Sequence, residues 1–254
     1  MAELVRLTVQ DGLARITIDR PPLNVLTIAM LDALSEALDR AAGTAGVRLV
    51  RLDAVGKAFS AGVDVADHVG DRVGLMMTAL ARLFDAFERI PVPTVSIVQG
   101  AALGGGCEVA LGADLCVASE TASFGQPEIR LGLFAPPASV LLPRIVGERR
   151  ALGLLLSGET IRASEAERIG LVNRVFPAER FEAEVDAWLA GLLAHSGAAL
   201  ALAKSAVREG RDASPAVART RVDRLYLEEL MRTADAQEGL AAFMEKRRPV
   251  WRHR

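Results

Sequence analysis

The sequence predicts an α/β fold followed by a helical C-terminal region. Over residues 1–194, short stretches rich in Val, Ile and Leu alternate with longer stretches of helical periodicity. That alternation is typical of strands joined by crossover helices. From about His195 onward the pattern is helical only. Because no low-complexity linker separates the two parts, we expect a core over residues 1–194 with a helical appendage over residues 195–254.

The first elements are a hairpin and a helix. Residues 4–9 and 14–18 read as strands, and the Asp11-Gly12 pair between them favours a tight hairpin turn. Thr27 can cap a helix that runs to about Ala42. The apolar face of this helix is expected at Ile28, Leu31, Leu34 and Leu38.

The next elements continue the alternation. We expect a strand over 47–54, a helix over 72–90, a strand over 94–98, a helix that begins near Glu108, and a strand over 114–118. Periodicity alone does not separate a Rossmann-type sheet from other α/β layouts.

Three helical segments make up the C-terminal region, at 198–208, 214–231 and 234–245. An amphipathic layer on an already complete α/β body needs a surface to cover, which favours contact with a neighbouring subunit. The apolar positions of this region include Leu200, Leu202, Val207, Leu225, Leu230 and Leu240.

Composition excludes several classes of function. Of the 254 residues, 51% are hydrophobic, 24% are charged and 4% are aromatic, and the net charge is −2. These values fit a folded soluble protein and offer neither the basic surface nor the aromatic platform of a nucleic-acid binder. No apolar run is long enough to predict a membrane span, and the N-terminus lacks the layout of a signal peptide. We therefore expect a cytoplasmic protein.

Cysteine and histidine usage gives no sign of a disulfide framework or a metal site. Cys107 and Cys116 both lie in apolar sequence and read as buried thiols. The three histidines are scattered without ligand spacing. His68 follows the stretch 57–64 and is a candidate for the wall of a pocket.

Two glutamates carry the chemical signal. Glu108 ends the Gly-rich stretch 101–108, and Glu128 ends the stretch 124–128, 20 residues later. Glycines bring bare backbone N–H groups close to a ligand, and two acids beside such donors can move protons and stabilise an oxyanion. A Gly-rich turn followed by an unrelated glutamate would show the same spacing. Spacing alone favours neither interpretation.

Several motifs in order resemble the enoyl-CoA hydratase/isomerase (crotonase) superfamily, and together they cover nearly the whole chain. Besides the two glutamate segments, the matching stretches are 19–24, 57–64, 91–95, 157–159, 166–173 and 238–246. The resemblance implies the crotonase spiral of repeated β-β-α turns. It also implies a homo-oligomer, a trimer or a dimer of trimers, whose contacts come from the C-terminal helices.

The resemblance implies an acyl-CoA hydratase, a lyase that adds water to an α,β-unsaturated thioester. In the hydratases both matching positions are glutamate and hold the nucleophilic water between them. We assign water activation to Glu108 and the α-carbon proton to Glu128, although the split of acid and base stays open. The alternatives are an isomerase of the same superfamily that uses Glu128 alone, and a catalytically silent CoA-binding subunit.

The resemblance maps an oxyanion hole to the backbone N–H groups of Val63 and Gly105. A thioester carbonyl gains negative charge as its conjugated double bond is attacked, so donors aimed at its oxygen lower the barrier. Without the family match, Val63 would read as an ordinary strand end.

Coenzyme A enters as part of the substrate, and no separate cofactor is implied. For Lys246, attraction of a CoA phosphate and simple membership of a solvated charge run are equally open interpretations. The residues that the resemblance assigns to CoA and substrate binding are Leu23, Ser60, Ala61, Asp64, Phe134, Phe243 and Lys246.

The sequence departs from the common family pattern after Glu128. Many hydratases continue with a glycine-rich stretch, whereas residues 131–139 contain Phe134, Pro136 and Pro137. Paired prolines fix φ and remove N–H donors, so the acyl pocket should change shape and suit a compact or cyclic acyl group. This stretch and the tail 225–231 look more like the cyclohexa-1,5-diene-1-carbonyl-CoA hydratase subgroup.

Overall fold

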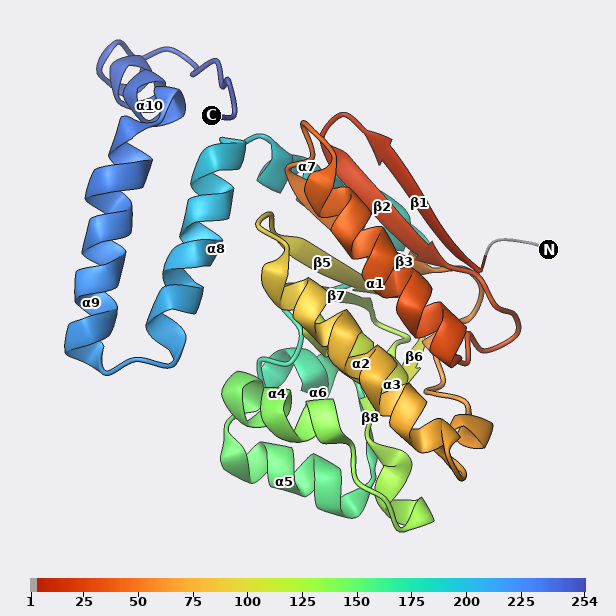
Figure 1. Ribbon diagram of the computed structural model, residues 1–254. Coiled ribbons are helices and arrows are strands. Elements are labelled where there is room, and N and C mark those ends of the chain that lie inside the picture. Colours follow the sequence, from red (N-terminus) through yellow and green to blue (C-terminus); the bar gives the residue numbers. More distant parts are fainter. Residues whose placement is uncertain (1–3) are drawn as a thin grey trace.

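The computed structural model describes residues 4–254 (Figure 1), and the strands of this part of the chain form two sheets. A six-stranded sheet has the spatial order β1 (Val5–Gln10), β2 (Leu13–Ile18), β3 (Leu49–Ala54), β5 (Thr94–Val98), β7 (Leu115–Ser119) and β10 (Arg174–Phe176). A four-stranded sheet has the order β4 (Ala58–Ser60), β6 (Ala101–Leu103), β8 (Ser123–Gly125) and β9 (Thr160–Arg162).

Each repeat of the chain gives one strand to each sheet. β3, β5 and β7 join the larger sheet, and the strands that directly follow them, β4, β6 and β8, join the smaller one. Neighbours within each of these sets pair in parallel. Helix α2 (Arg72–Arg89) follows β4, and α3 (Gly105–Gly112) follows β6. This is the β-β-α spiral expected from the sequence.

The hairpin and the first helix agree with their sequence signals. β1 and β2 pair antiparallel around Asp11 and Gly12, which have φ values of 50° and 87°. Positive φ at both central residues is what a tight hairpin turn requires. Helix α1 (Ile28–Gly43) is capped by Thr27, whose side chain accepts a hydrogen bond from the Met30 N–H.

Both faces of the larger sheet are covered. Ile16 and Leu52 lie in the main core with α1 and α2, whereas Val95 and Ile97 on the other face pack on α7 (Phe181–Leu193). All five residues of β5 are buried as a consequence. Thr94 and Ser96 alternate with Val95 and Ile97 along β5, yet both sets are buried because both faces of the sheet are covered.

The segment between β8 and α7 was not predicted element by element. It begins with the short 3₁₀ helix η2 (Pro127–Leu131) and ends with β10 and a second such turn, η3 (Ala178–Arg180). The helices between them are α4 (Pro136–Val146), α5 (Glu148–Ser157) and α6 (Ala163–Arg168).

The C-terminal region differs from the expectation at one point. Helices α8 (Gly197–Arg211) and α10 (Ala234–Met244) match their predictions, but the helix expected over 214–231 ends early. Helix α9 (Pro215–Arg224) passes into a π turn over Leu225–Glu229 and a 3₁₀ turn over Leu230–Arg232. A small pocket between this segment and α8 is lined on the side of the segment by Val222, Leu225, Tyr226 and Leu230.

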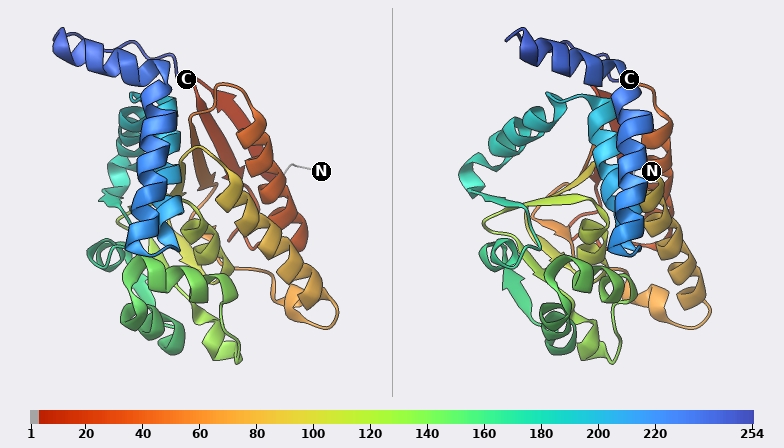
Figure 2. Two further views of the ribbon diagram at one scale, coloured as in Figure 1. Left: turned by 60° about the vertical axis from the view of Figure 1, so that its left-hand side comes forward. Right: turned by 90° about the vertical axis from the view of Figure 1, so that its left-hand side faces the viewer.

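Figures 1 and 2 show α8 lying along the body while α9 and α10 extend away from it. Charged side chains of α8 make the junction. Lys204 Nζ donates to the Val92 carbonyl at 2.7 Å and pairs with Asp114 at 2.6 Å. Arg208 donates to the Phe87 carbonyl at 2.9 Å and also reaches Asp114. The start of the appendage is therefore fixed to the end of α2 and to the loop before β7.

No single helix within residues 4–254 is both long and apolar enough to cross a lipid bilayer. Residues Ala178–Leu193 and Gly197–Arg211 meet the requirement of length and composition only when taken together, across a 92° bend.

We predict that Lys204→Met destabilises the protein by about 3 kcal/mol, because it removes a cation that is only 6% exposed, leaves the Val92 carbonyl without this donor and leaves Arg208 as the remaining cation paired with Asp114. Urea unfolding at fixed protein concentration measures the change. Lys246→Met removes an exposed lysine and serves as the control. Equal unfolding midpoints for the two variants would contradict the prediction.

Candidate active site

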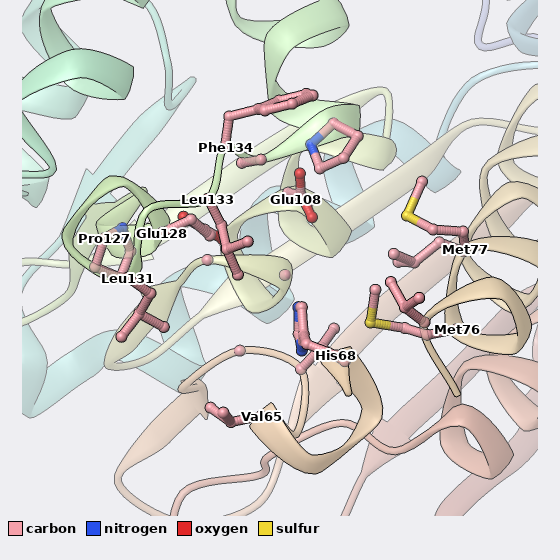
Figure 3. A pocket seen from close by; sticks show the side chains of 18 of the residues that line it. Val65, His68, Met76, Met77, Glu108, Pro127, Glu128, Leu131, Leu133 and Phe134 are labelled. Atoms are coloured by element: carbon pink, nitrogen blue, oxygen red, sulfur yellow. The ribbon is translucent and has the colours of Figure 1, made fainter. Parts of the chain in front are cut away.

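A cavity of about 560 Å³ lies beside the first turn of α3 (Figure 3). Its walls come from the loop 61–68, the first half of α2, the glycine turn 104–108 and the segment 127–136. Most of the lining is apolar, with Val65, Met76, Met77, Leu80, Leu133 and Phe134 prominent. The ionisable side chains in the wall are His68, Glu108, Glu128 and Arg130. The setting is an apolar pocket with a few convergent polar groups, as in many ligand sites.

The glycine turn permits unusually close contacts. Gly104 has a φ of 51°, and a Cβ atom placed there would lie 2.6 Å from Glu128 Oε1. A Cβ atom on Gly105 would lie 2.5 Å from Val63 Cγ2. A side chain at either position would therefore push Glu128 or Val63 out of place, and at Gly104 the positive φ adds backbone strain.

Glu108 lies in the first turn of α3 and is only 3% exposed. Its Oε1 accepts a hydrogen bond from the Ala138 N–H at 3.0 Å. Pro136 and Pro137 occupy the first two positions of α4 and have no N–H, so Ala138 supplies the first amide donor of that helix. Burial raises the pKa of Glu108 to about 8; the Ala138 N–H opposes this rise, and the negative charge of Glu128 adds to it.

Glu128 lies in η2, directly after Pro127, on a second wall of the cavity. Its Oε2 is buried and finds no hydrogen-bond partner within residues 4–254. Burial raises the pKa of this carboxyl as well; its own N–H opposes the rise, and so does positive charge on His68. An unpartnered buried oxygen favours the protonated acid.

The two carboxyl groups face one space (Figure 3). Burial disfavours ionisation of each, and a charge on Glu128 makes ionisation of Glu108 harder still. The pair is therefore set to hold a proton near neutral pH and to titrate as a unit. It offers one carboxylate and one carboxylic acid to a molecule between them.

Two backbone amides complete the site. Leu26 pairs with both neighbours of Val63, because its N–H donates to the Gly62 carbonyl at 2.8 Å and its carbonyl accepts from Asp64 at 2.8 Å. Within residues 4–254, neither the Val63 N–H nor the Gly105 N–H donates to an acceptor. A Cβ atom on Gly105 would lie 3.2 Å from the Val63 nitrogen, so the two amides are close neighbours at the cavity.

The residues predicted to bind CoA fall into different environments. Ala61 lines the cavity, and its N–H donates to the carbonyl of the half-exposed Leu23 at 2.9 Å. Asp64 caps the 3₁₀ helix η1 (Val65–His68). Ser60 is fully buried, and its hydroxyl donates to the Asn24 carbonyl at 2.8 Å. This hydrogen bond joins the end of β4 to the segment before α1, and the CoA contact expected at Ser60 stays a prediction.

Phe134 lines the cavity while remaining 70% exposed. Phe243 and Lys246 do not line it; both are exposed, on α10 and just after it. Figure 1 shows α10 at the opposite end of the molecule from α4 and α5. Within one chain, the structure therefore does not bring these two residues to the glutamates.

Sequence reasoning found His68, which lines the cavity, but missed two kinds of contributor. Met76 and Leu80 lie on the helix expected over 72–90, and helical periodicity does not distinguish a core residue from a residue of a cavity wall. The Ala138 N–H left no signal, since every residue except proline carries one. The pair of prolines before it was the available clue.

Comparison with known proteins identifies the relatives of this site. The sequence profile of the enoyl-CoA hydratase/isomerase family matches residues 8–254. The chain belongs to that family. Among family members, it is 42% identical over 249 residues to the cyclohexa-1,5-dienecarbonyl-CoA hydratase of Thauera aromatica, which covers 96% of this chain and 95% of the relative. It is 35% identical over 242 residues to a probable enoyl-CoA hydratase of Mycobacterium bovis, covering 94% of each.

Solved structures from the enoyl-CoA hydratase/isomerase family share the fold. The enoyl-CoA hydratase of Mycobacterium smegmatis superposes with a TM-score of 0.93 at 33% identity, covering 98% of this chain and 99% of that one. The enoyl-CoA hydratase of Bacillus anthracis superposes with a TM-score of 0.94 at 29% identity, covering 99% and 100%. The predicted family and its crotonase-like fold are confirmed.

We predict that the stability of the wild type falls relative to Glu108→Gln as pH rises from 5 to 8. The folded protein keeps the Glu108 proton up to a pKa of about 8, whereas the unfolded chain releases it near 4.5. Between these values unfolding releases a proton, so the wild type loses roughly 1 kcal/mol per pH unit against the variant. Denaturant titrations across this range measure the difference. A difference independent of pH would contradict the buried-acid interpretation.

Proposed function

We propose that this protein adds water to the double bond of an α,β-unsaturated acyl-CoA thioester. The observation that carries the proposal is the pair of buried carboxyl groups at one apolar cavity, beside two free backbone amides. The names of the relatives, enoyl-CoA and cyclohexadienecarbonyl-CoA hydratases, support the same reaction.

The amides of Val63 and Gly105 act on the thioester carbonyl. As the β-carbon is attacked, the electrons of the double bond move toward the carbonyl and its oxygen gains negative charge. Two N–H groups directed at that oxygen stabilise the enolate, and loss of one such donor typically costs roughly 3–4 kcal/mol of barrier. Because both donors are main-chain groups, they are in place before the substrate arrives.

The glutamates move the protons. The reactive form of the pair is the one in which the shared proton lies on Glu128 and Glu108 is the carboxylate. Water then forms its new C–O bond at the β-carbon and gives a proton to Glu108. The carboxylic acid of Glu128 gives a proton to the α-carbon, so the elements of one water molecule are added. Transfer of the proton from Glu108 to Glu128, directly or through water, restores the starting state. The Ala138 N–H fixes Glu108 Oε1, which leaves Oε2 to receive the proton from water.

The acyl part is expected to be compact or cyclic. Phe134 and Pro136 line the cavity, and the rigid start of α4 stands where a glycine-rich segment would be flexible. Pro137, expected in the same wall, is not part of the lining and instead occupies the second position of α4. The Thauera aromatica relative, named for a cyclic dienoyl substrate, supports this class of acyl group.

The direct test is a spectrophotometric assay that follows the enoyl-thioester absorbance with linear and cyclic substrates, combined with product analysis. Loss of absorbance with a hydroxyacyl product supports the proposal. A shifted double bond without hydration would indicate the isomerase alternative. Binding without any turnover would indicate a silent CoA-binding subunit.

We predict that Glu108→Gln and Glu128→Gln each lower kcat by at least about 100-fold, because each removes one proton-transfer group. Affinity for a saturated acyl-CoA, measured by calorimetry, should change little. Glu179→Gln alters an exposed glutamate outside the cavity and is the matched control. Near-normal hydration by either active-site variant would contradict the two-carboxylate mechanism.

We predict that Phe134→Ala broadens acyl selectivity. Removing the ring opens one end of the cavity, so kcat/KM for a ten-carbon enoyl-CoA should rise at least about tenfold relative to that for crotonyl-CoA. Leu156→Ala, which truncates an exposed apolar residue elsewhere, controls for surface effects. An unchanged ratio would show that Phe134 does not limit the acyl group.

We further propose a homotrimer, or a dimer of trimers. The C-terminal helices expose large apolar side chains in the single chain, among them Val207, Leu227, Phe243 and Met244. A neighbouring subunit would cover them and could bring Phe243 and Lys246 to its own CoA molecule. Light scattering at micromolar concentration should give a multiple of three times the chain mass, and a monomer mass would contradict the proposal.

A further inference from the structure

His68 stands on a rigid part of the cavity wall. It ends η1, whose N-terminus is capped by Asp64. The buried Asp67 accepts hydrogen bonds from the Ile28 N–H at 3.1 Å and from Arg72 Nε at 2.8 Å. These contacts hold η1 against the start of α1 and the start of α2, so the backbone of His68 has a fixed position.

The imidazole has a defined orientation as well. His68 Nδ1 lies 3.1 Å from the Asp64 carbonyl oxygen. A carbonyl oxygen only accepts hydrogen bonds, so Nδ1 must carry the hydrogen. In the neutral ring Nε2 is then an acceptor, and within residues 4–254 it has no hydrogen-bond partner.

The side chains on this side of the cavity are apolar. Val65, Val73, Met76 and Leu80 form the wall on the same side of the cavity, and none of them can pair with Nε2. Figure 3 shows His68 beside Met76, across the cavity from the loop that carries Glu128. An apolar acyl group that fills this part of the cavity would displace water from Nε2 and leave it unpaired.

We propose that His68 makes the acyl site selective for acyl groups that carry a hydroxyl beyond the reacting double bond. The hydroxyl donates to Nε2 of the neutral ring, and it can accept from Nε2 if the ring is protonated. A site that offers a hydrogen bond to a substrate hydroxyl discriminates against the analogue without one. This inference rests on the proposed function for the acyl-CoA class, and it adds the chemistry of the acyl group.

The test is a binding experiment that needs no turnover. Cyclohexanecarbonyl-CoA and 4-hydroxycyclohexanecarbonyl-CoA are saturated, so neither can be hydrated, and the hydroxyl cannot be eliminated across the α,β-bond. Calorimetry with the wild type should show about fivefold to tenfold tighter binding of the hydroxylated compound, the range expected for one hydrogen bond.

Three variants sharpen the result. His68→Leu should bind both compounds equally, and His68→Gln, which keeps an acceptor oxygen, should retain part of the preference. His195→Leu changes an exposed histidine outside the cavity and should behave as the wild type does.

Equal affinities in the wild type, or a preference that survives in His68→Leu, would overturn this inference while leaving the proposed function intact. Failure of both compounds to bind the wild type would overturn both. A fall in kcat of His68→Leu on every substrate, without a change in the binding preference, would assign His68 to proton transfer and likewise overturn its selectivity role.

Discussion

The close packing of Glu128, Val63 and Ser60 against Gly104, Gly105 and Gly106 is the constraint on which the site depends. A Cβ atom on Gly106 would lie 2.5 Å from the Ser60 carbonyl oxygen, and its two neighbours leave equally little room. Because no side chain intervenes, the start of α3 can lie directly against the loop after β4. This contact brings the free amides together and sets Glu108 at the cavity.

The same packing buries two carboxyl groups and so disfavours their ionisation, and one nearby contact offsets this effect at Glu108. Two carboxyl groups in an apolar cavity resist ionisation, which suits proton exchange but would hold both in the neutral form. The start of α4 counters this effect at one of them, because the Ala138 N–H and the positive end of the helix both favour a negative charge on Glu108. Glu128 receives no comparable donor from another residue, so the two acids are not equivalent.

Features that depend on neighbours along the chain could be predicted from the sequence, and features that depend on packing could not. The cap at Thr27 and the turn at Asp11-Gly12 are set by local chemistry, and both formed as expected. Motif order predicted the family and the fold. In contrast, the pairing of Glu108 with Ala138 joins a side chain to a backbone group 30 residues away, and nothing in the sequence marks that amide. The hydrogen bond from the Ser60 hydroxyl to the Asn24 carbonyl is likewise unmarked in the sequence, because it joins residues 36 apart.

The two prolines at the start of α4 also fix which amide of that helix can serve the site. Neither proline has an N–H, so the first donor that α4 can offer is the one that reaches Glu108. A residue inserted between Pro137 and Ala138 would turn this donor by about 100° around the helix axis and away from Glu108. A residue inserted earlier, in the exposed loop before Pro136, would be absorbed by that loop. Tolerance of insertions should therefore end sharply at the first proline.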